Sequence, residues 1–186
     1  MVPLLIVIGL VIVIGLIVAS MYNRLVRLRN TCESSWSDID VQLKKRYNLI
    51  PNLVETVKGY AKHEKEVFEN VTRARSAAMQ AGSPEEQAQS ENILRGTLKS
   101  LFAVAEAYPE LKANSNFQQL QSQLQRVEED IESARRYYNA IVRDYNTATE
   151  SFPSNLIANS FGFTKRQFFE LDEPEEIRKP PRVDFS

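Results

Sequence analysis

The first residues of the chain, VPLLIVIGLVIVIGLIVAS (2–20), carry no charged side chain. At about 1.5 Å per residue, such a helix reaches roughly 28 Å, close to the hydrocarbon thickness of a bilayer. The alternatives are a cleaved signal peptide and a buried core helix. A signal peptide usually has Lys or Arg before its apolar run, and here only the terminal amine precedes it. We therefore predict a transmembrane anchor at residues 1–21.

Basic side chains follow this run and predict its orientation. Arg24, Arg27 and Arg29 come first, and Lys44, Lys45 and Arg46 come later. Positive residues favour the cytoplasmic side, so we expect a single-pass protein of the cell (inner) membrane, with the N-terminus outside and the remainder cytoplasmic. The first three arginines could each gain about 1 kcal/mol from anionic headgroups. The second basic cluster lies roughly 30 Å or more further along a helix, too far for headgroups if the helix stands upright.

Composition indicates an all-α protein. Lys and Arg number 23 and Asp and Glu 24, a balance that argues against nucleic-acid binding. Good helix formers dominate beyond the apolar run, and the few glycines are scattered. The single cysteine, Cys32, excludes an intramolecular disulfide.

A helical stripe runs from the apolar segment to about Gly82. Its apolar positions follow steps of three or four within successive series, which are Leu25, Leu28, Cys32, Trp36, Ile39 and Leu43, then Ile50, Val54, Val57 and Ala61, then Val67 or Phe68, Val71 and Ala74. Pro51 interrupts it, because proline removes one backbone hydrogen bond and clashes with the carbonyl of Tyr47. The stripe continues on both sides, so we predict one helix that kinks near Pro51, continuous with the membrane helix.

Capping signals predict two further long helices. Ser83, Pro84 and Glu86 form a capping box, and that helix should end near Tyr108 and Pro109. The next begins at Asn114–Asn116, where Ser115 and Gln118 form a second candidate box. Its heptad seam, which predicts coiled-coil-like packing, consists of Phe117, Leu120, Leu124, Val127, Ile131, Ala134, Tyr138, Ile141, Tyr145 and Ala148.

Short connections between these segments favour antiparallel neighbours. We therefore predict an elongated up-and-down bundle at residues 22–163, made of three long helices and a short fourth at Ser154–Ser160 that closes at Gly162. Residues 164–186 become charged and proline-rich, and we expect an extended or mobile tail.

Recognised motifs of catalytic, metal-binding and phosphate-binding sites are absent from the sequence. It has no HExxH, CxxC, GxGxxG, Walker or GxSxG pattern. Cys32 and the single histidine, His63, would lie roughly 45 Å apart on one helix, too far to act together. Two Glu-x-x-His motifs for a di-iron bundle are also lacking. We predict no enzymatic activity, no metal and no cofactor.

Polar residues on two of the helices suggest a network or partner surface. Buried tyrosines need partners for their hydroxyls, and polar side chains of the first helix could face those of the third. The candidates are Asp38, Asp40, Lys44, Lys45, Arg46, Asn48, Asn52, Arg135, Tyr138, Asn139, Arg143, Asp144 and Tyr145.

Several long segments closely resemble the LemA family of bacterial membrane proteins. They are YNRLVRLRN (22–30), WSDIDVQLKKRYNLIPNLVETVKGYAKHEK (36–65), TRAR (72–75), ARRYYNAIVRDYNTATESFPSNLIA (134–158) and FGF (161–163). The resemblance implies a single-pass membrane protein with an antiparallel four-helix bundle, an N-out, C-in orientation and no established enzymatic activity. Cys32 and Ser35 stand where the family pattern has Val and Ala. The family transfers no catalytic residue.

Two functional hypotheses follow. The leading one is a non-enzymatic, membrane-anchored helical scaffold that self-associates or docks partners and organises or remodels the membrane. Its partners would be membrane lipids and either further copies of the chain or other membrane proteins, with no nucleic acid. The alternative is a membrane-linked sensor or signalling adaptor with the Pro51 kink as its moving part. An enzyme with a site shared between subunits is a third, less favoured, hypothesis.

Overall fold

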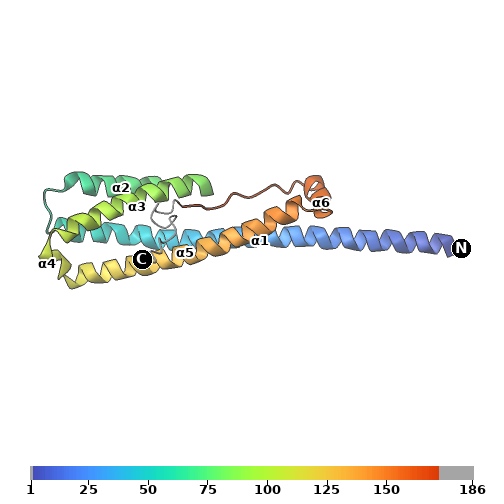
Figure 1. The fold of residues 1–186 in the computed structure, drawn as a ribbon, viewed down its shortest axis with the longest axis horizontal. Helices are drawn as coiled ribbons and strands as arrows, with labels where there is room; N and C mark the ends of the chain where they lie inside the picture. Colours follow the sequence, from blue (N-terminus) through green and yellow to red (C-terminus); the bar gives the residue numbers. More distant parts are fainter. Residues whose placement is uncertain (1, 172–186) are drawn as a thin grey trace, which may run out of the picture. The chain divides into compact units, whose positions relative to one another are not determined.

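Every regular element in residues 2–171, the part that the computed structural model describes, is a helix (Figure 1). The helices are α1 (Val2–Lys58), α2 (Lys65–Ala78), α3 (Pro84–Glu106), α4 (Pro109–Lys112), α5 (Ser115–Glu150) and α6 (Ser154–Ser160). This confirms the predicted all-α class. Most of the segment predicted as a tail, residues 172–186, lies outside the described part.

The chain divides into two compact units. Unit 1 comprises residues 1–46 and 124–168, and unit 2 comprises residues 47–123 and 169–186. Helices α1 and α5 each contribute to both units, with the divisions falling after Arg46 and after Gln123.

In unit 1, α1 and α5 pack antiparallel. Trp36 contacts Tyr138 with ring centroids 5.3 Å apart, and Arg46 Nη1 lies 2.7 Å from Glu128 Oε1. Residue numbers therefore rise along one helix as they fall along the other. The buried side chains, all 9 % exposed or less, are Leu25, Cys32, Ile39 and Leu43 from α1, and Leu124, Val127, Ile131, Tyr138, Val142, Tyr145 and Ala148 from α5. The predicted seam is thus largely buried, although Leu120, Ala134 and Ile141 are half-buried and Val142 takes a core position.

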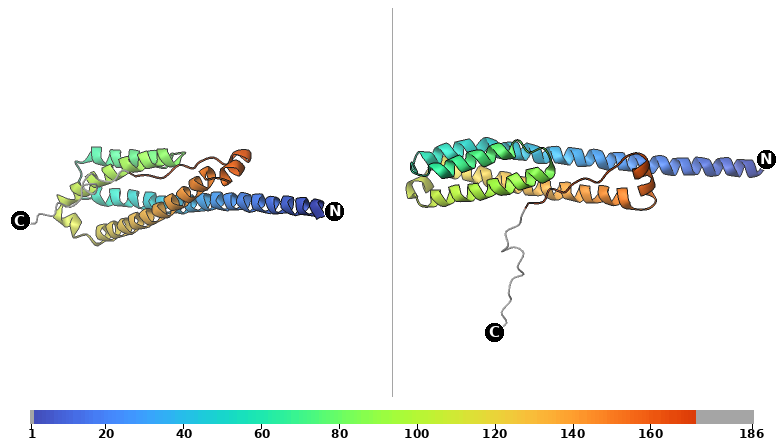
Figure 2. Two further views of the ribbon diagram at one scale, coloured as in Figure 1. Left: turned by 45° about the vertical axis from the view of Figure 1, so that its right-hand side comes forward. Right: turned by 90° about the horizontal axis from the view of Figure 1, so that it is seen from above.

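The short helix α6 completes unit 1 and lies beside α1 (Figure 2). Ser154 Oγ donates to the carbonyl of Ala148 over 2.7 Å, which fixes the turn that follows α5. Gly162 has φ +72°, a conformation that glycine adopts without strain, and there the chain turns away from α6. The rings of Phe161 and Phe163 then pack on Tyr22. The predicted short helix at Ser154–Ser160 is confirmed.

In unit 2, α2 returns antiparallel to the end of α1. Lys58 Nζ lies 5.8 Å from the ring centroid of Phe68, and Arg75 Nε donates to the carbonyl of Tyr47 over 2.7 Å. Helix α2 in turn packs along α3, and the two helices lie side by side in Figures 1 and 2. Phe102 of α3 contacts Phe117 at the start of α5.

The prediction of one helix from residue 22 to about residue 81 is wrong, because the chain turns at residues 59–64. Gly59 has a low helix propensity, and Ala61, fully buried, fixes the turn in the core. The apolar spacing continues across this turn from Val57 to Phe68. Periodicity alone therefore could not reveal the break. With α4, the described residues contain six helices where the sequence predicted four.

The predicted capping box of α3 is confirmed with one variation. Ser83 Oγ accepts the backbone N–H of Glu86 over 3.1 Å, while Glu86 Oε2 accepts the N–H of Gly82 rather than that of Ser83. For α5 the predicted Ser115 box is wrong. Asn114 caps this helix instead, since its Oδ1 accepts the N–H of Phe117 over 3.0 Å.

Helix α1 continues through Pro51, so the prediction of one helix rather than two is confirmed; the kink itself stays a prediction. Proline has no N–H to offer the carbonyl of Tyr47, four residues earlier. The Arg75 guanidinium donates to that carbonyl from α2. A side chain thus replaces the backbone hydrogen bond that Pro51 removes.

We expect Arg75→Ala to lower the free energy of unfolding by about 1–3 kcal/mol, because a partly buried carbonyl loses a charged donor. In a Pro51→Ala background the loss should be smaller, since the introduced alanine supplies the helical N–H. Chemical denaturation of the full chain in mild detergent measures both. The control is Arg73→Ala, which changes an exposed arginine of the same helix. If the effects of Arg75→Ala and Pro51→Ala add within about 0.5 kcal/mol, the Arg75 guanidinium does not replace the backbone donor that Pro51 removes.

Candidate functional surfaces

The N-terminal part of α1 is an exposed apolar helix. It is long and apolar enough to cross a membrane, and none of its most apolar window is buried against the rest of the described chain. Arg24, Arg27 and Arg29 follow it, and all three are exposed. The Arg29 guanidinium carbon lies 5.3 Å from the ring centroid of Phe163, a cation–π contact that orients this side chain.

The residues predicted as a polar network or partner surface separate into exposed and buried sets. Asp40 pairs with Lys44 over 2.6 Å on the surface of α1, while Arg135 and Asn139 are half-buried. Those that face solvent are Asp38, Lys44, Lys45, Asn48, Asn52, Arg143 and Asp144, and those in the core are Arg46, Tyr138 and Tyr145. The exposed members are available to partners, whereas the buried ones serve packing.

The hydroxyl of Tyr138 bonds to a segment that the sequence did not identify as its partner. It donates to the carbonyl of Gln167 over 2.9 Å, within the strap, which we define as residues 164–168. Asn146 donates to the carbonyl of Arg166 and accepts its N–H, at 3.0 and 2.9 Å. Arg166 Nη2 then reaches Glu33 on α1 at 2.6 Å. The strap therefore links α5 to α1, although it lies at the start of the predicted tail.

Arg46, which is buried, pairs with the partly exposed Glu128 in unit 1. Its side chain is 1 % exposed, and Nη1 lies 2.7 Å from Glu128 Oε1. The sequence grouped Arg46 with Lys44 and Lys45 as one basic cluster, but only these two lysines are exposed. A guanidinium offers five donors in a planar fork, which suits a buried pairing better than an ammonium group does.

Unit 2 contains a buried polar cluster that the sequence did not predict. The hydroxyl of Tyr47 donates to Glu91, and Gln87 Nε2 lies 2.8 Å from that hydroxyl and 2.9 Å from Glu91 Oε1. The same amide donates to the carbonyl of Ala78 over 3.2 Å. This cluster joins α1, α2 and α3. In the sequence, the i, i+4 spacing of Gln87 and Glu91 is the feature that points to this cluster.

Burial raises the pKa of one thiol and two phenols in the core of unit 1. Burial raises the pKa of the Cys32 thiol above its ordinary value, and nearby Arg166 opposes this shift. Burial likewise raises the pKa of Tyr138 and of Tyr145. Because the thiolate is the reactive form of cysteine, Cys32 is a packing residue at neutral pH.

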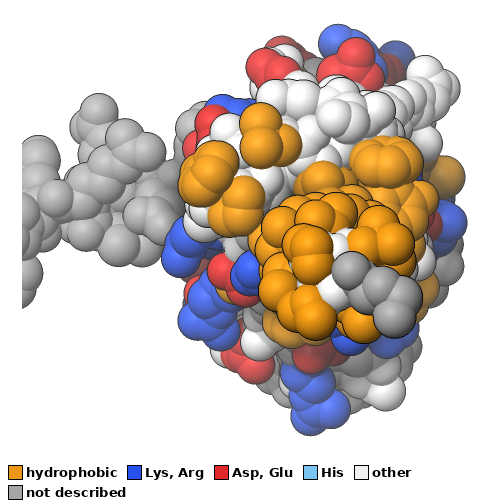
Figure 3. Space-filling view, turned by 90° about the vertical axis from the view of Figure 1, so that its right-hand side faces the viewer, with side chains coloured by type: hydrophobic (Ala, Val, Ile, Leu, Met, Phe, Trp, Pro, Cys, Tyr) orange, Lys and Arg blue, Asp and Glu red, His pale blue; other side chains and the backbone are white. Residues whose placement is uncertain are grey.

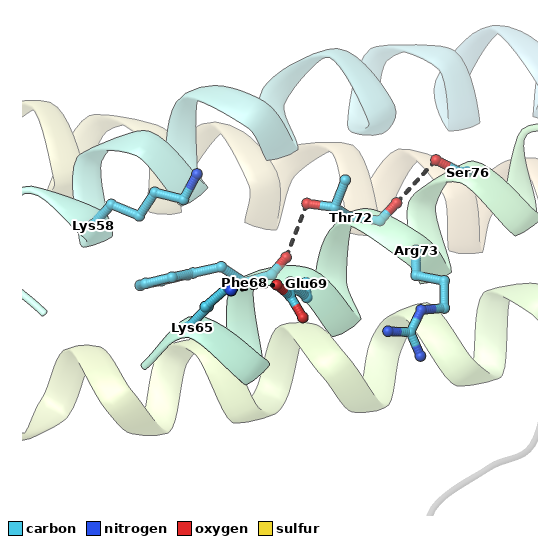
Figure 4. A pocket seen from close by; sticks show the side chains of 7 residues that line it. All are labelled: Lys58, Lys65, Phe68, Glu69, Thr72, Arg73 and Ser76. Atoms are coloured by element: carbon cyan, nitrogen blue, oxygen red, sulfur yellow. Dashed lines mark hydrogen bonds and ion pairs between the residues drawn. The ribbon is translucent and has the colours of Figure 1, made fainter. Parts of the chain in front are cut away.

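An open groove of about 530 Å³ lies on unit 2 (Figure 4). Thr72 and Ser76 bond to main-chain carbonyls of α2, and Lys65 pairs weakly with Glu69 at 3.6 Å. Its lining consists of Lys58, Lys65, Phe68, Glu69, Thr72, Arg73 and Ser76. Three cations and one carboxylate give the groove a net positive charge, which suits an acidic partner.

No group of three or more His, Cys, Asp or Glu side chains that could hold a metal ion occurs within residues 2–171. His63 is exposed in the turn between α1 and α2, and Cys32 is 2 % exposed in the core of unit 1.

These features define a class of helical proteins with an exposed N-terminal helix that is a candidate membrane span. The sequence profile of the LemA family matches residues 35–185, so the chain belongs to the LemA family. This confirms the resemblance seen in the sequence.

Relatives with assigned names agree with this family. Protein LemA of Metamycoplasma hominis is 26 % identical over 159 residues, covering 83 % of this chain and 71 % of that protein. Magnetosome proteins MamQ 1 and MamQ 2 of Paramagnetospirillum magneticum are 24 % identical over 175 residues, covering 80 % of this chain. The match spans 64 % of the length of each MamQ protein, slightly less than two thirds.

We expect Glu128→Ala to lower the free energy of unfolding by about 1–3 kcal/mol, because it leaves the Arg46 charge buried without this carboxylate. The exposed Asp130, two residues further on α5, provides the control Asp130→Ala, which should change stability by less than about 0.5 kcal/mol. Denaturant titration monitored by circular dichroism compares them. Equal effects of the two substitutions would show that the ion pair contributes nothing.

Proposed function

We propose that this protein is a non-enzymatic, membrane-anchored helical scaffold that acts through self-association or partner docking and organises or remodels the membrane. The observation that carries the proposal is α1, a single helix whose exposed apolar end continues without interruption into the core of unit 1. An apolar helix of this length is costly to leave in water and satisfies its own backbone hydrogen bonds in lipid.

The polar side chains support a scaffold rather than a catalyst. Arg46 and Arg75 each bond to a specific acceptor on another helix, Arg166 of the strap bonds to Glu33 of α1, and burial raises the pKa of the Cys32 thiol. Two surfaces remain for partners. One is the exposed polar face of α1, and the other is the open groove on unit 2 with its net positive charge. The sensor hypothesis built on Pro51 stays a prediction.

Anchoring includes an orientation, with the N-terminus outside and the chain that follows the apolar run in the cytoplasm. The surface residues Arg24 and Arg27 support it, because positive residues next to a span favour the cytoplasmic side.

Protease added to intact cells should leave a C-terminal tag uncut, whereas the tag should be lost after the inner membrane is permeabilised. A tag on the N-terminus should show the opposite protection and serves as the control. Rapid loss of the C-terminal tag from intact cells would reverse the orientation.

For the scaffold itself, light scattering of the full chain in mild detergent should give a protein mass of more than one chain. Amine crosslinking in cells should yield the same oligomer or a complex with a membrane protein. Lys44 and Lys45 are exposed and available to the reagent. A Lys44→Arg, Lys45→Arg variant keeps the charge but not these amines, and serves as the control for crosslinking through this face.

A single-chain mass at every protein concentration, together with no crosslinked species in cells, would overturn the scaffold proposal.

A further inference from the structure

We propose that residues 151–163, here called the α6 tip, form a second membrane-contacting surface that inserts apolar side chains at the boundary between headgroups and acyl chains. The α6 tip comprises the turn after α5, helix α6 and the residues up to Phe163. The inference rests on the proposed membrane anchoring of α1. It assigns a lipid-binding role to a segment that has no role in that proposal.

The first argument is the level of the α6 tip along α1. The apolar segment of residues 2–20 ends at Ser20, and Tyr22 lies about 3 Å further along the helix axis. The ring centroid of Tyr22 is 4.9 Å from that of Phe161 and 5.7 Å from that of Phe163. The α6 tip is therefore held where α1 would leave the hydrocarbon.

The second argument is the exposure of large apolar side chains. Phe152 is 80 % exposed, Leu156 56 % and Phe161 59 %. Residues 151–163 carry no charged side chain, although charged residues are frequent in the rest of the chain. Aromatic and leucine side chains with this exposure are typical of segments that lie in the membrane interface.

The third argument is that the α6 tip is structurally defined rather than a loose loop. Ser154 Oγ donates to the carbonyls of Ala148 and Ser151, at 2.7 and 2.9 Å. The N–H of Phe163 donates to the carbonyl of Ala158 over 2.9 Å, and Ala158 is fully buried. One side of the α6 tip thus packs within unit 1 while Phe152, Leu156 and Phe161 remain exposed.

Basic side chains border this surface. Arg24 and Arg27 lie on the surface one or two turns beyond the apolar segment of residues 2–20, whereas Lys165, which follows the α6 tip, is paired at 2.5 Å with Glu150. A cationic border beside an apolar surface suits anionic headgroups.

A bilayer is the occupant that these observations favour, because the apolar surface of the α6 tip adjoins that of the proposed anchor. Figure 3 looks along α1 from its N-terminal end and shows further hydrophobic side chains beside the apolar end of that helix. An anchor that enters lipid brings this face to the membrane surface. A protein partner there would first have to displace headgroups.

The test uses the full chain, reconstituted in vesicles of phosphatidylcholine and phosphatidylglycerol. An environment-sensitive fluorophore is attached to single cysteines in a Cys32→Ser background. Leu156→Cys and Phe152→Cys report on the α6 tip, Ile12→Cys on the anchor, and Lys44→Cys on an exposed position away from both. Circular dichroism confirms that each variant keeps its helix content.

Lipids brominated near the headgroup or near the chain end then quench the fluorophore according to its depth. An interfacial segment lies about 5–10 Å into the boundary, so Leu156 and Phe152 labels should lose more emission to the shallow bromines than to the deep ones. The Ile12 label, near the middle of the run, should show the reverse, and the Lys44 label should lose none.

Quenching at Ile12 but at neither position of the α6 tip would overturn this inference while leaving the anchor intact. No quenching at Ile12 would overturn the anchoring proposal itself. If the vesicles lack phosphatidylglycerol and the α6 tip is still quenched, apolar insertion alone holds it there. A weaker quenching without that lipid supports the additional role of the basic border.

Discussion

The structure depends on the continuity of α1. One helix carries the apolar segment and, with no glycine or proline between Ser20 and Arg46, the core positions that pack against α5. Since the backbone groups between the apolar run and Arg46 bond within the helix, the same element is compatible with lipid at one end and with a protein core at the other. Tyr22, two residues after the apolar run, contacts Phe161, the residue that follows α6. The apolar segment is therefore joined to the packed part of unit 1 directly, without a linker.

Arginine side chains join the helices within each unit. Arg75 donates to the carbonyl that Pro51 leaves without its helical N–H, Arg46 pairs with Glu128, and Arg166 extends from the strap to Glu33. Each of these contacts makes a specific pairing of helices more favourable than alternatives with the same apolar pattern. The charged residues of the chain thus have a structural function that its near-zero net charge does not reveal.

Several elements were predictable because their signals are local. The heptad spacing from Leu124 to Ala148 identifies one face of α5, and Ser83 with Glu86 identifies the start of α3. The turn at Gly59 was not predictable, since the apolar positions before and after it keep helical spacing. The partners of buried polar groups were also missed. Tyr138 bonds to Gln167, whose position depends on the path of the chain after α6.

The sequence by itself determined the helical class, the uncharged N-terminal run and the family, because these depend on composition, short periods and long contiguous motifs. Only the tertiary structure decided that Arg46 is buried while Lys44 and Lys45 are exposed, and that residues 164–168 form a strap. It also placed the α6 tip beside Tyr22. The physical reason is that burial and hydrogen-bond partners follow from which helices meet, and pairings between distant residues leave no periodic trace in a single sequence.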